Sequence, residues 1–260
     1  MALIDYRVDD GLGIIEINNP PANVYNLDSL KLLDEAIVAA RFDESVHVIV
    51  LTGAGDKFFC AGADIQMLSS ETTEFKNNFA LFGHETLLKL ENTPKLVIAG
   101  INGHCVGGGL EIAMACDIRI AKKDAGRVGL AEVNLGVIPG MGGTQRLPRL
   151  VGRARALELG ATGRMVAFEE AVAWNLIHDI FDPEDFKDQI SDYSRQFVAP
   201  NKPSKAVGLI KRAIQSGING SLSDGLALER EALAQAFDSV DAAEGLQAYQ
   251  DKRVAKFVGK

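Results

Sequence analysis

The alternation of apolar and polar residues predicts strands in the first half of the chain. Residues 4–8 alternate between apolar and charged side chains, which is the period of a half-buried strand. Residues 14–17 follow an Asp-Asp-Gly turn and carry three isoleucines, so a β-hairpin is expected here. The continuous apolar runs at 46–51 and 96–101 are typical of strands in a parallel sheet that is covered on both faces.

Helical periodicity separates these strands and then takes over the chain. Residues 30–42 carry an apolar stripe at helical spacing, and residues 75–90 form a second long helix. Two short strands are expected at 118–121 and 177–181. Only helices are predicted after that point, over residues 184–199, 204–216, 223–237 and 241–256.

Strands that alternate with helices indicate right-handed βαβ units. We therefore expect an α/β core over residues 1–195 and a C-terminal helical region over residues 196–260. No repeat of fixed length and no low-complexity linker interrupts this order. A chain of 260 residues, of which 47% are hydrophobic, is long enough for one large core.

The charge balance argues against nucleic acid as a partner. The net charge is −8, whereas a protein that binds nucleic acid usually carries a basic stripe or an excess of cations. The predicted helix within residues 29–45 has only Lys31 and Arg41 as cations, against four acidic residues. We therefore expect no nucleic-acid partner.

Cysteine, histidine and hydropathy patterns restrict the class of protein further. The three cysteines show no CxxC spacing and the four histidines show no ligand spacing, so neither a disulfide framework nor a metal site is predicted. No run of about 18 apolar residues indicates a membrane span, and the acidic N-terminus does not resemble a signal peptide. These features predict a cytoplasmic protein with reduced thiols and no membrane partner.

The stretch from Val97 to Asp117 carries the first candidate site. A buried strand ends near Gly100, three consecutive glycines follow at 107–109, and a short helix begins there. The first N–H groups of a helix are unpaired and lie at the positive end of its dipole, which suits a negatively charged oxygen. Alternatively, the glycines only allow this helix to pack closely on a strand.

Two glutamates lie in apolar surroundings in or near this stretch. Glu111 is the only charged residue within 106–115, and Glu132 lies in the sequence Gly-Leu-Ala-Glu-Val. A buried carboxyl has a raised pKa, so each of these side chains would exchange protons near neutral pH. In the alternative, Glu111 lies on a solvent-facing helix surface and Glu132 in an exposed loop.

Four motifs make the chain similar to the enoyl-CoA hydratase/isomerase (crotonase) superfamily. They are FFCAGADI at 58–65, KLVIAGINGHCVGGGLEIAMACDIRIA at 95–121, GLAEVNLGVIPGMGGTQRLPRLVG at 129–152 and DAAEGLQAYQDKRVAKF at 241–257. The resemblance covers essentially the whole chain. It implies an α/β fold built as a spiral of ββα and βαβ turns, with a C-terminal helical region used in trimerisation. Assembly as a homotrimer, or as a homohexamer of two stacked trimers, is implied as well.

The resemblance also implies roles for the glycines and the glutamates. The backbone N–H groups of Ala63 and Gly108 would form an oxyanion hole for the thioester oxygen. Glu111 would orient and deprotonate water for addition at the β-carbon, and Glu132 would deliver or remove the α-proton. Because both glutamates are present, the resemblance favours an enoyl-CoA hydratase over a double-bond isomerase that uses Glu132 alone. The pair also argues against a non-catalytic scaffold of the same fold.

Coenzyme A is expected to bind beside this centre as part of the substrate, with no separate cofactor. Lys252 and Arg253 are candidates for contacts with the CoA phosphates, or else solvated charges on a helix surface. Asp64 is also a candidate helix cap. The positions implied for substrate and CoA binding are Ala22, Ala61, Asp64, Ile65, Gln66 and Gly140.

Three positions depart from the family's pattern. Gln66 stands where hydratases often have lysine, and Ala131 stands where proline is common before the second glutamate. Gly126 lies in a segment where a pattern with an aromatic residue is frequent. A pocket altered beside Glu132 would suit a cyclic or branched unsaturated acyl group, so the resemblance leaves the acyl group open.

Overall fold

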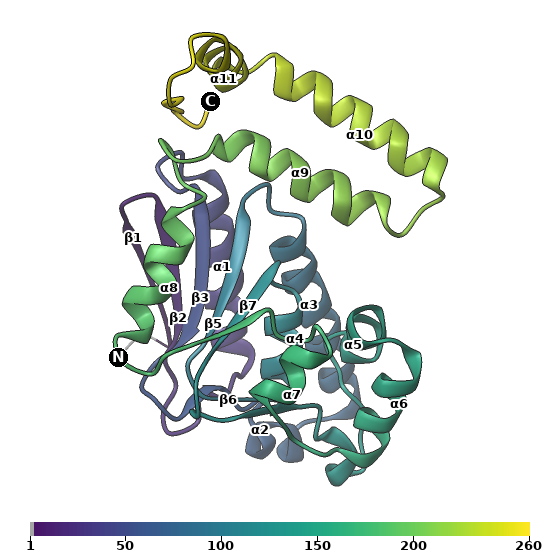
Figure 1. The fold of residues 1–260 in the computed structure, drawn as a ribbon. Coiled ribbons are helices and arrows are strands. Elements are labelled where there is room, and N and C mark those ends of the chain that lie inside the picture. Colours follow the sequence, from purple (N-terminus) through teal and green to yellow (C-terminus); the bar gives the residue numbers. More distant parts are fainter. Residues whose placement is uncertain (1–2) are drawn as a thin grey trace.

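The computed structural model describes residues 3–260 and arranges their strands in two sheets (Figure 1). In the larger sheet, β1 and β2 pair antiparallel, and every later pair of neighbours is parallel, as the apolar runs predict. Its six strands, in spatial order, are β1 (Ile4–Asp9), β2 (Leu12–Ile17), β3 (Val48–Gly53), β5 (Leu96–Ile101), β7 (Ile118–Lys122) and β10 (Asp179–Phe181).

The smaller sheet consists of strands that are two or three residues long. They are β4 (Phe58–Cys60), β6 (His104–Val106), β8 (Arg127–Gly129) and β9 (Val166–Ala167). The hydrophobic pattern did not predict them, because so short a segment shows no clear alternation. The chain passes from the larger to the smaller sheet in three successive turns, β3 to β4, β5 to β6 and β7 to β8. This repeated passage is the spiral that the resemblance implied.

Helices cover both faces of the larger sheet. The face that includes Ile15 and Ile49 packs against α1, α3 and α4 in the main core. The opposite face is covered by α8, which contributes Phe186 and Ile190 to a second apolar cluster. These helices are α1 (Leu27–Phe42), α3 (Thr73–Glu91), α4 (Gly108–Met114) and α8 (Phe186–Arg195), and the shorter elements between them are α2 (Ile65–Ser70), the 3₁₀ helix η1 (Glu132–Leu135), α5 (Gly143–Val151), α6 (Arg153–Thr162) and α7 (Phe168–Ala173).

The last three helices, α9 (Ser204–Gly217), α10 (Leu222–Phe237) and α11 (Val240–Gln250), form an arm beyond one end of the larger sheet (Figure 1). Lys211 of α9 joins this arm to the core. Its ammonium group lies 2.9 Å from the Asp117 carboxylate and donates hydrogen bonds to two backbone carbonyls of the core. The predicted division of the chain after residue 195 stays a prediction.

The final predicted helix was too long. The sequence pattern predicted a helix over 241–256, whereas α11 ends at Gln250. The chain turns back after α11, and Lys252 has a φ of 55°. The Asp241 carboxylate accepts hydrogen bonds from the N–H groups of Val258 and Gly259 at 2.7 and 2.8 Å. This polar pairing of the tail replaces the last predicted helical turn.

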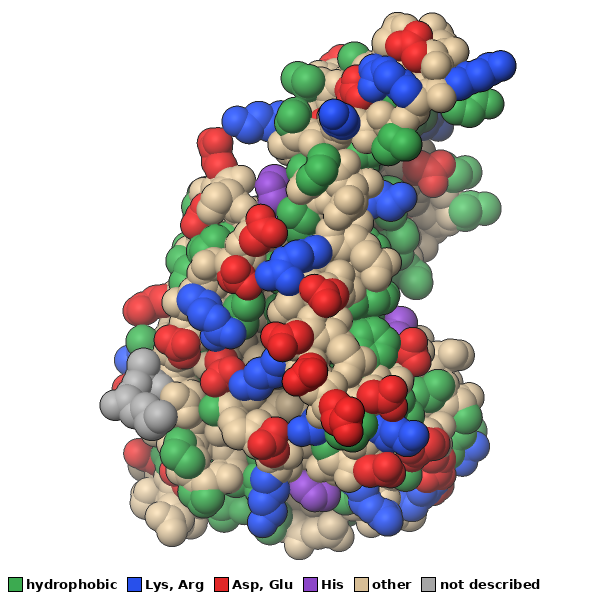
Figure 2. Space-filling model, turned by 60° about the vertical axis from the view of Figure 1, so that its left-hand side comes forward, with side chains coloured by type: hydrophobic (Ala, Val, Ile, Leu, Met, Phe, Trp, Pro, Cys, Tyr) green, Lys and Arg blue, Asp and Glu red, His purple; other side chains and the backbone are tan. Residues whose placement is uncertain are grey.

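The surface of the body is mixed in charge. Figure 2 shows acidic and basic side chains interspersed over one face, without a continuous basic stripe on that face. Within residues 3–260, no helix combines the length and the apolar character that crossing a membrane requires.

Candidate active site

The glycines between β6 and α4 shape the start of that helix. Gly107 has a positive φ of 55°, and its N–H donates to the carbonyl of Gly129 at 2.8 Å. A β-carbon on Gly109 would collide with the carbonyl oxygen of Cys60, so α4 lies on β4 at backbone distance. The close-packing interpretation of the glycines is therefore correct for Gly109. The N–H of Gly108 donates to no other group within residues 3–260.

Ala63 lies beside Gly108 because two loops meet there. Tyr25 and Ala63 form an isolated parallel bridge, in which the Tyr25 N–H donates to the Gly62 carbonyl at 2.9 Å. A β-carbon on Gly62 would lie 3.2 Å from the Gly108 nitrogen. In the described part of the chain the Ala63 N–H has no acceptor either. An oxyanion hole requires unpaired backbone donors of this kind at adjacent positions.

Glu111 lies in the first turn of α4 and is only 1% exposed, so the solvent-facing alternative is wrong. Its Oε1 accepts hydrogen bonds from the N–H groups of Met141 and Gly143, both at 2.7 Å. Burial raises the pKa of the carboxyl, and these donors together with Arg146 and the Gly140 N–H offset part of the increase. Glu111 is thus held in a fixed orientation by backbone donors.

Arg146 holds the loop that faces Glu111. Its guanidinium contacts both oxygens of Glu91 at 2.8 Å and donates to the Met141 carbonyl at 2.7 Å. The sequence does not indicate this pair, because 55 residues separate Arg146 from Glu91 and no spacing connects them. Arg146 is a positioning residue, since it fixes the loop whose N–H groups bind the catalytic candidate.

Glu132 opens η1 and borders the same glycines. A β-carbon on Gly107 would lie 2.9 Å from Oε1 of Glu132. Its Oε2 is buried and has no hydrogen-bond partner within residues 3–260. Burial, followed by a smaller effect of the Glu111 charge, raises the pKa of Glu132 to about 7. The structure therefore brings Glu111, Glu132, Ala63 and Gly108 together, although Ala63 and Glu132 lie far apart in sequence.

The residues predicted to contact CoA lie in the loop before α2 and beside it. The carbonyl of Ala22 accepts a hydrogen bond from the Ala61 N–H at 3.0 Å. Asp64 is the N-cap of α2 and accepts from the Gln66 N–H at 2.8 Å, which agrees with the capping alternative. Ile65 and Gln66 are exposed at the start of this helix. Their contacts with CoA stay predictions.

The two cations after α11 lie outside this site within one chain. Lys252 and Arg253 follow α11, the last helix of the arm, which Figure 1 shows projecting away from the body that contains α4. The Arg253 guanidinium pairs with both oxygens of Glu244, at 2.6 and 2.9 Å. Its charge is therefore already partnered on the surface of the arm.

Gly126 does not lie beside Glu132, contrary to the expectation from the sequence. A β-carbon on Gly126 would collide with the backbone of Gly103 and His104, at the start of β6. Gly107, which borders Glu132, follows the other end of β6. The glycine at 126 is thus explained by the close approach of two strands, and not by the shape of an acyl pocket.

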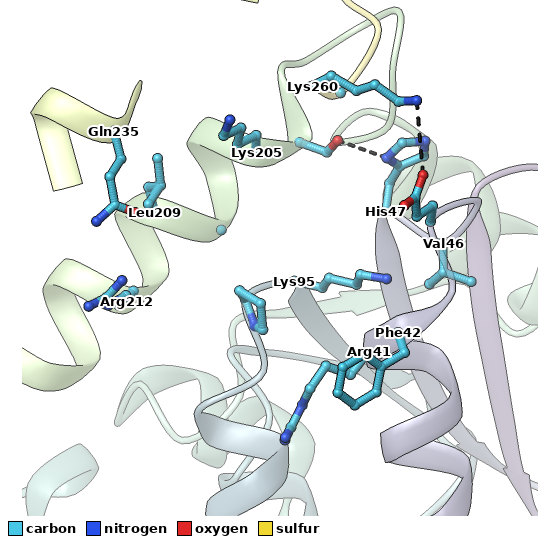
Figure 3. Close-up of a pocket in the computed structure, with 15 residues that line it drawn as sticks. Arg41, Phe42, Val46, His47, Lys95, Lys205, Leu209, Arg212, Gln235 and Lys260 are labelled. Atoms are coloured by element: carbon cyan, nitrogen blue, oxygen red, sulfur yellow. Dashed lines mark hydrogen bonds and ion pairs between the residues drawn. The ribbon is translucent and has the colours of Figure 1, made fainter. Parts of the chain in front are cut away.

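A separate hollow lies between the end of α1, the starts of β3 and β5, and α9 (Figure 3). It lies at the amino ends of β3 and β5. Ala63 and Gly108, in contrast, follow the carboxyl ends of β4 and β6. Lys95 donates there to the carbonyls of Ala40 and Asp43 at 2.7 and 2.6 Å. The Lys95 ammonium group is thus already bound by carbonyls at the C-terminal end of α1. For this reason the hollow is a weaker candidate for the active site.

The chain is similar in sequence and in structure to known proteins of one family. The sequence model of the family described as enoyl-CoA hydratase/isomerase matches residues 7–260. The chain is 39% identical to the short-chain-enoyl-CoA hydratase of Clostridium acetobutylicum over 93% of this chain and 92% of that protein. It is 36% identical to the crotonyl-CoA hydratase of Syntrophomonas wolfei over 97% of this chain and 96% of that protein. The crystal structure of an enoyl-CoA hydratase from Geobacillus kaustophilus matches with a TM-score of 0.97 at 38% identity, over 100% of this chain and 98% of that chain. The protein described here therefore belongs to the enoyl-CoA hydratase/isomerase family.

Proposed function

We propose that this protein is an enoyl-CoA hydratase, a hydro-lyase that adds water reversibly across the α,β double bond of an unsaturated acyl-CoA. The observation that carries the proposal is the pair of carboxyls, Glu111 and Glu132, around the start of α4. Water addition needs one group for the water and one for the α-carbon, whereas isomerisation needs a single acid–base group. Membership of the family and the names of its similar members support the same reaction.

In the proposed reaction, the N–H groups of Ala63 and Gly108 bind the thioester oxygen. Glu111 takes a proton from water as the water oxygen bonds to the β-carbon, and the electrons of the double bond move towards the thioester oxygen. Glu132 then gives its proton to the α-carbon, and both additions occur on one face of the double bond. A backbone donor to such an oxyanion is worth roughly 3–4 kcal/mol in the transition state.

The proposal places CoA along the loop before α2 and assigns no cofactor besides the CoA of the substrate. Within residues 3–260, no three potential ligands among His, Cys, Asp and Glu gather as a metal site would require. Lys252 of a neighbouring subunit is the proposed contact for the CoA phosphates, because Arg253 already pairs with Glu244. The residues assigned to CoA and acyl binding are Ala22, Ala61, Asp64, Ile65, Gln66 and Gly140.

The proposal extends to the setting in which the enzyme works. We place it in the cytoplasm, as a homotrimer or homohexamer that associates through the arm formed by α9, α10 and α11. Neither nucleic acid nor a membrane is proposed as a partner, because the net charge is −8 and acidic and basic side chains are mixed on the face shown in Figure 2.

The substitution Glu111→Gln tests the proposed reaction. Crotonyl-CoA is the first substrate to try, because similar proteins are named for short-chain and crotonyl-CoA hydration. We expect the loss of the water-activating carboxylate to lower kcat by roughly 10²–10⁴-fold. The matched control is Glu35→Gln, which changes an exposed carboxyl of α1 and is expected to leave kcat unchanged.

The same variants separate hydration from double-bond isomerisation. Both reactions are followed in D₂O with 2-enoyl and 3-enoyl thioesters, so that α-proton exchange is measured beside water addition. If Glu111→Gln keeps isomerisation while the wild-type protein hydrates no enoyl-CoA, the protein is an isomerase that uses Glu132 alone. Hydration that survives Glu111→Gln at the wild-type rate would contradict the role given to Glu111.

A further inference from the structure

Tyr25 is locked to the loop that carries Ala63. Its N–H donates to the Gly62 carbonyl at 2.9 Å, and its own carbonyl accepts from the Asp64 N–H at 2.8 Å. These two bonds form the bridge between Tyr25 and Ala63 and leave the Ala63 N–H free. The backbone of Tyr25 is therefore fixed relative to one of the two proposed oxyanion donors.

The side chain of Tyr25 reaches the other proposed donor. It is 5% exposed, and its ring lies beside that of Phe79, with centroids 5.9 Å apart and planes inclined by 31°. A β-carbon on Gly108 would collide with the Tyr25 hydroxyl oxygen. The hydroxyl is consequently in contact with the first residue of α4, whose N–H has no acceptor in the described chain.

The hydroxyl of Tyr25 has no partner of its own. No hydrogen bond among residues 3–260 involves it, although a buried tyrosine hydroxyl usually has one. Within residues 3–260, the fully buried side-chain nitrogen and oxygen atoms that lack a hydrogen-bond partner belong to Tyr6, Glu132 and Arg195. Because Tyr25 is not among them, its oxygen keeps some accessible surface.

The surroundings also keep this hydroxyl protonated. Burial, and then the charges of Glu111, Cys60 and Glu132, raise the pKa of Tyr25 well above its ordinary value. A tyrosine in this state donates a hydrogen bond throughout the pH range in which an enzyme of this kind works. Leucine or phenylalanine would fill the same space without leaving a buried donor unpaired.

We propose that the Tyr25 hydroxyl is a third donor to the thioester oxygen, beside the N–H groups of Ala63 and Gly108. This role rests on the proposed function. As negative charge develops on the thioester oxygen, a donor already oriented by the Ala63 loop and by Phe79 stabilises that charge without reorganisation. Tyr25 keeps its proton throughout, so the two glutamates still account for both of the protons that move.

The test is Tyr25→Phe, which keeps the ring and removes the donor. Its first readout is the near-UV absorbance of the enolate of acetoacetyl-CoA, a β-ketoacyl thioester that ionises when its oxygen is stabilised. We expect the bound enolate fraction at fixed pH to fall about tenfold, and kcat for crotonyl-CoA hydration to fall by roughly 10–100-fold with little change in KM. Tyr6→Phe is the matched control, because it removes a tyrosine hydroxyl that also has no hydrogen-bond partner and lies on strand β1.

A second variant, Tyr25→Leu, separates donation from pocket shape. The proposal predicts that Phe and Leu at position 25 give a similar loss of enolate. If Tyr25→Phe behaves like the wild-type protein and only Tyr25→Leu changes the preference for acyl length, then Tyr25 is a wall of the pocket and the proposal is wrong. If the wild-type protein hydrates no enoyl-CoA but still shows enolate formation that depends on Tyr25, the proposed function fails while the third donor stands.

Discussion

The two glutamates differ at the level of single atoms, and this difference supports the roles that we propose for them. Glu111 receives two backbone N–H donors at 2.7 Å, and such donors favour the ionised carboxyl. Glu132 Oε2 is buried without a partner in the described chain, and its pKa rises to about 7. Two carboxyls whose environments separate their pKa values can act as base and acid at the same pH. Burial raises the pKa of both carboxyls, but more backbone donors offset this at Glu111 than at Glu132, so Glu111 is the better suited of the two to take a proton and Glu132 to give one.

The pH dependence of hydration follows from this pair. Activity requires the singly protonated pair, so kcat/KM is expected to fall as pH rises through about 7, where Glu132 loses its proton. The value of kcat/KM also falls at low pH, where Glu111 becomes protonated. Because burial raises the pKa of Glu111, this fall is expected at a higher pH than the titration of an ordinary glutamate would give.

The check is a pH–rate profile measured in both directions. Water addition consumes no net proton, so dehydration must show the same two limbs as hydration. A profile that stays flat between about pH 6 and 9 would contradict the assignment of Glu132 as the acid.

At the level of elements, the site depends on how closely α4 approaches β4. Gly109→Ala would place a methyl group on the Cys60 carbonyl, and backbone cannot move aside cheaply. We expect a loss of about 1–3 kcal/mol in the free energy of unfolding, measured by urea denaturation, together with lower kcat because Gly108 shifts.

The control is Gly160→Ala in helix α6, where nothing lies within 4 Å of the new methyl group. That change is expected to stabilise the protein by about 0.5–1 kcal/mol, and equal effects of the two substitutions would count against the packing argument.

How much of each element the sequence could predict depends on its length and on its partners. The apolar runs of β3 and β5 and the stripes of α1 and α3 were predicted within a few residues, because each is long enough to show a period. The short strands of the second sheet were missed for the opposite reason. The end of α11 was wrong because Asp241 pairs with the tail, and such a contact leaves no periodic trace.

The candidate site shows the same limit. Local sequence places Glu111 one turn after Gly108, but only the spiral brings Ala63 and Glu132 to them. The roles expected for Ala63 and Glu132 therefore come from the resemblance to the family and not from the local sequence. No spacing connects Arg146, which lies in the motif at 129–152, with Glu91, and no motif indicates the Tyr25 hydroxyl. Contacts between distant segments set the environment of the carboxyls, and hence their pKa values.

For the whole molecule, one largely buried ion pair, between Lys211 and Asp117, contributes to the attachment of the arm. The Lys211 side chain is 5% exposed and that of Asp117 is 20% exposed, so Lys211→Met would leave a largely buried carboxylate without its cation. We expect a loss of about 3–5 kcal/mol in the free energy of unfolding at fixed protein concentration. Lys205→Met, an exposed position on the same helix, should change it by less than about 0.5 kcal/mol. Similar small effects at both positions would show that the pair does not anchor the arm.

The arm itself exposes more apolar surface than an isolated chain would tolerate well. Eight large hydrophobic side chains of the arm are at least 57% exposed: Ile210, Ile214, Ile218, Leu222, Phe237, Val240, Leu246 and Tyr249. Contiguous exposed apolar surface on a protein usually marks an interface. We therefore predict that sedimentation equilibrium gives three or six times the chain mass of 27.9 kDa, and that Phe237→Asp combined with Leu246→Asp lowers this multiple. Leu157→Asp is the matched control on α6, because Leu157 and Phe237 are both 60% exposed. A wild-type mass of one chain would contradict association through the arm, because the apolar side chains would then stay exposed. Equal dissociation by Leu157→Asp would contradict it as well, because the interface would then not be specific to the arm.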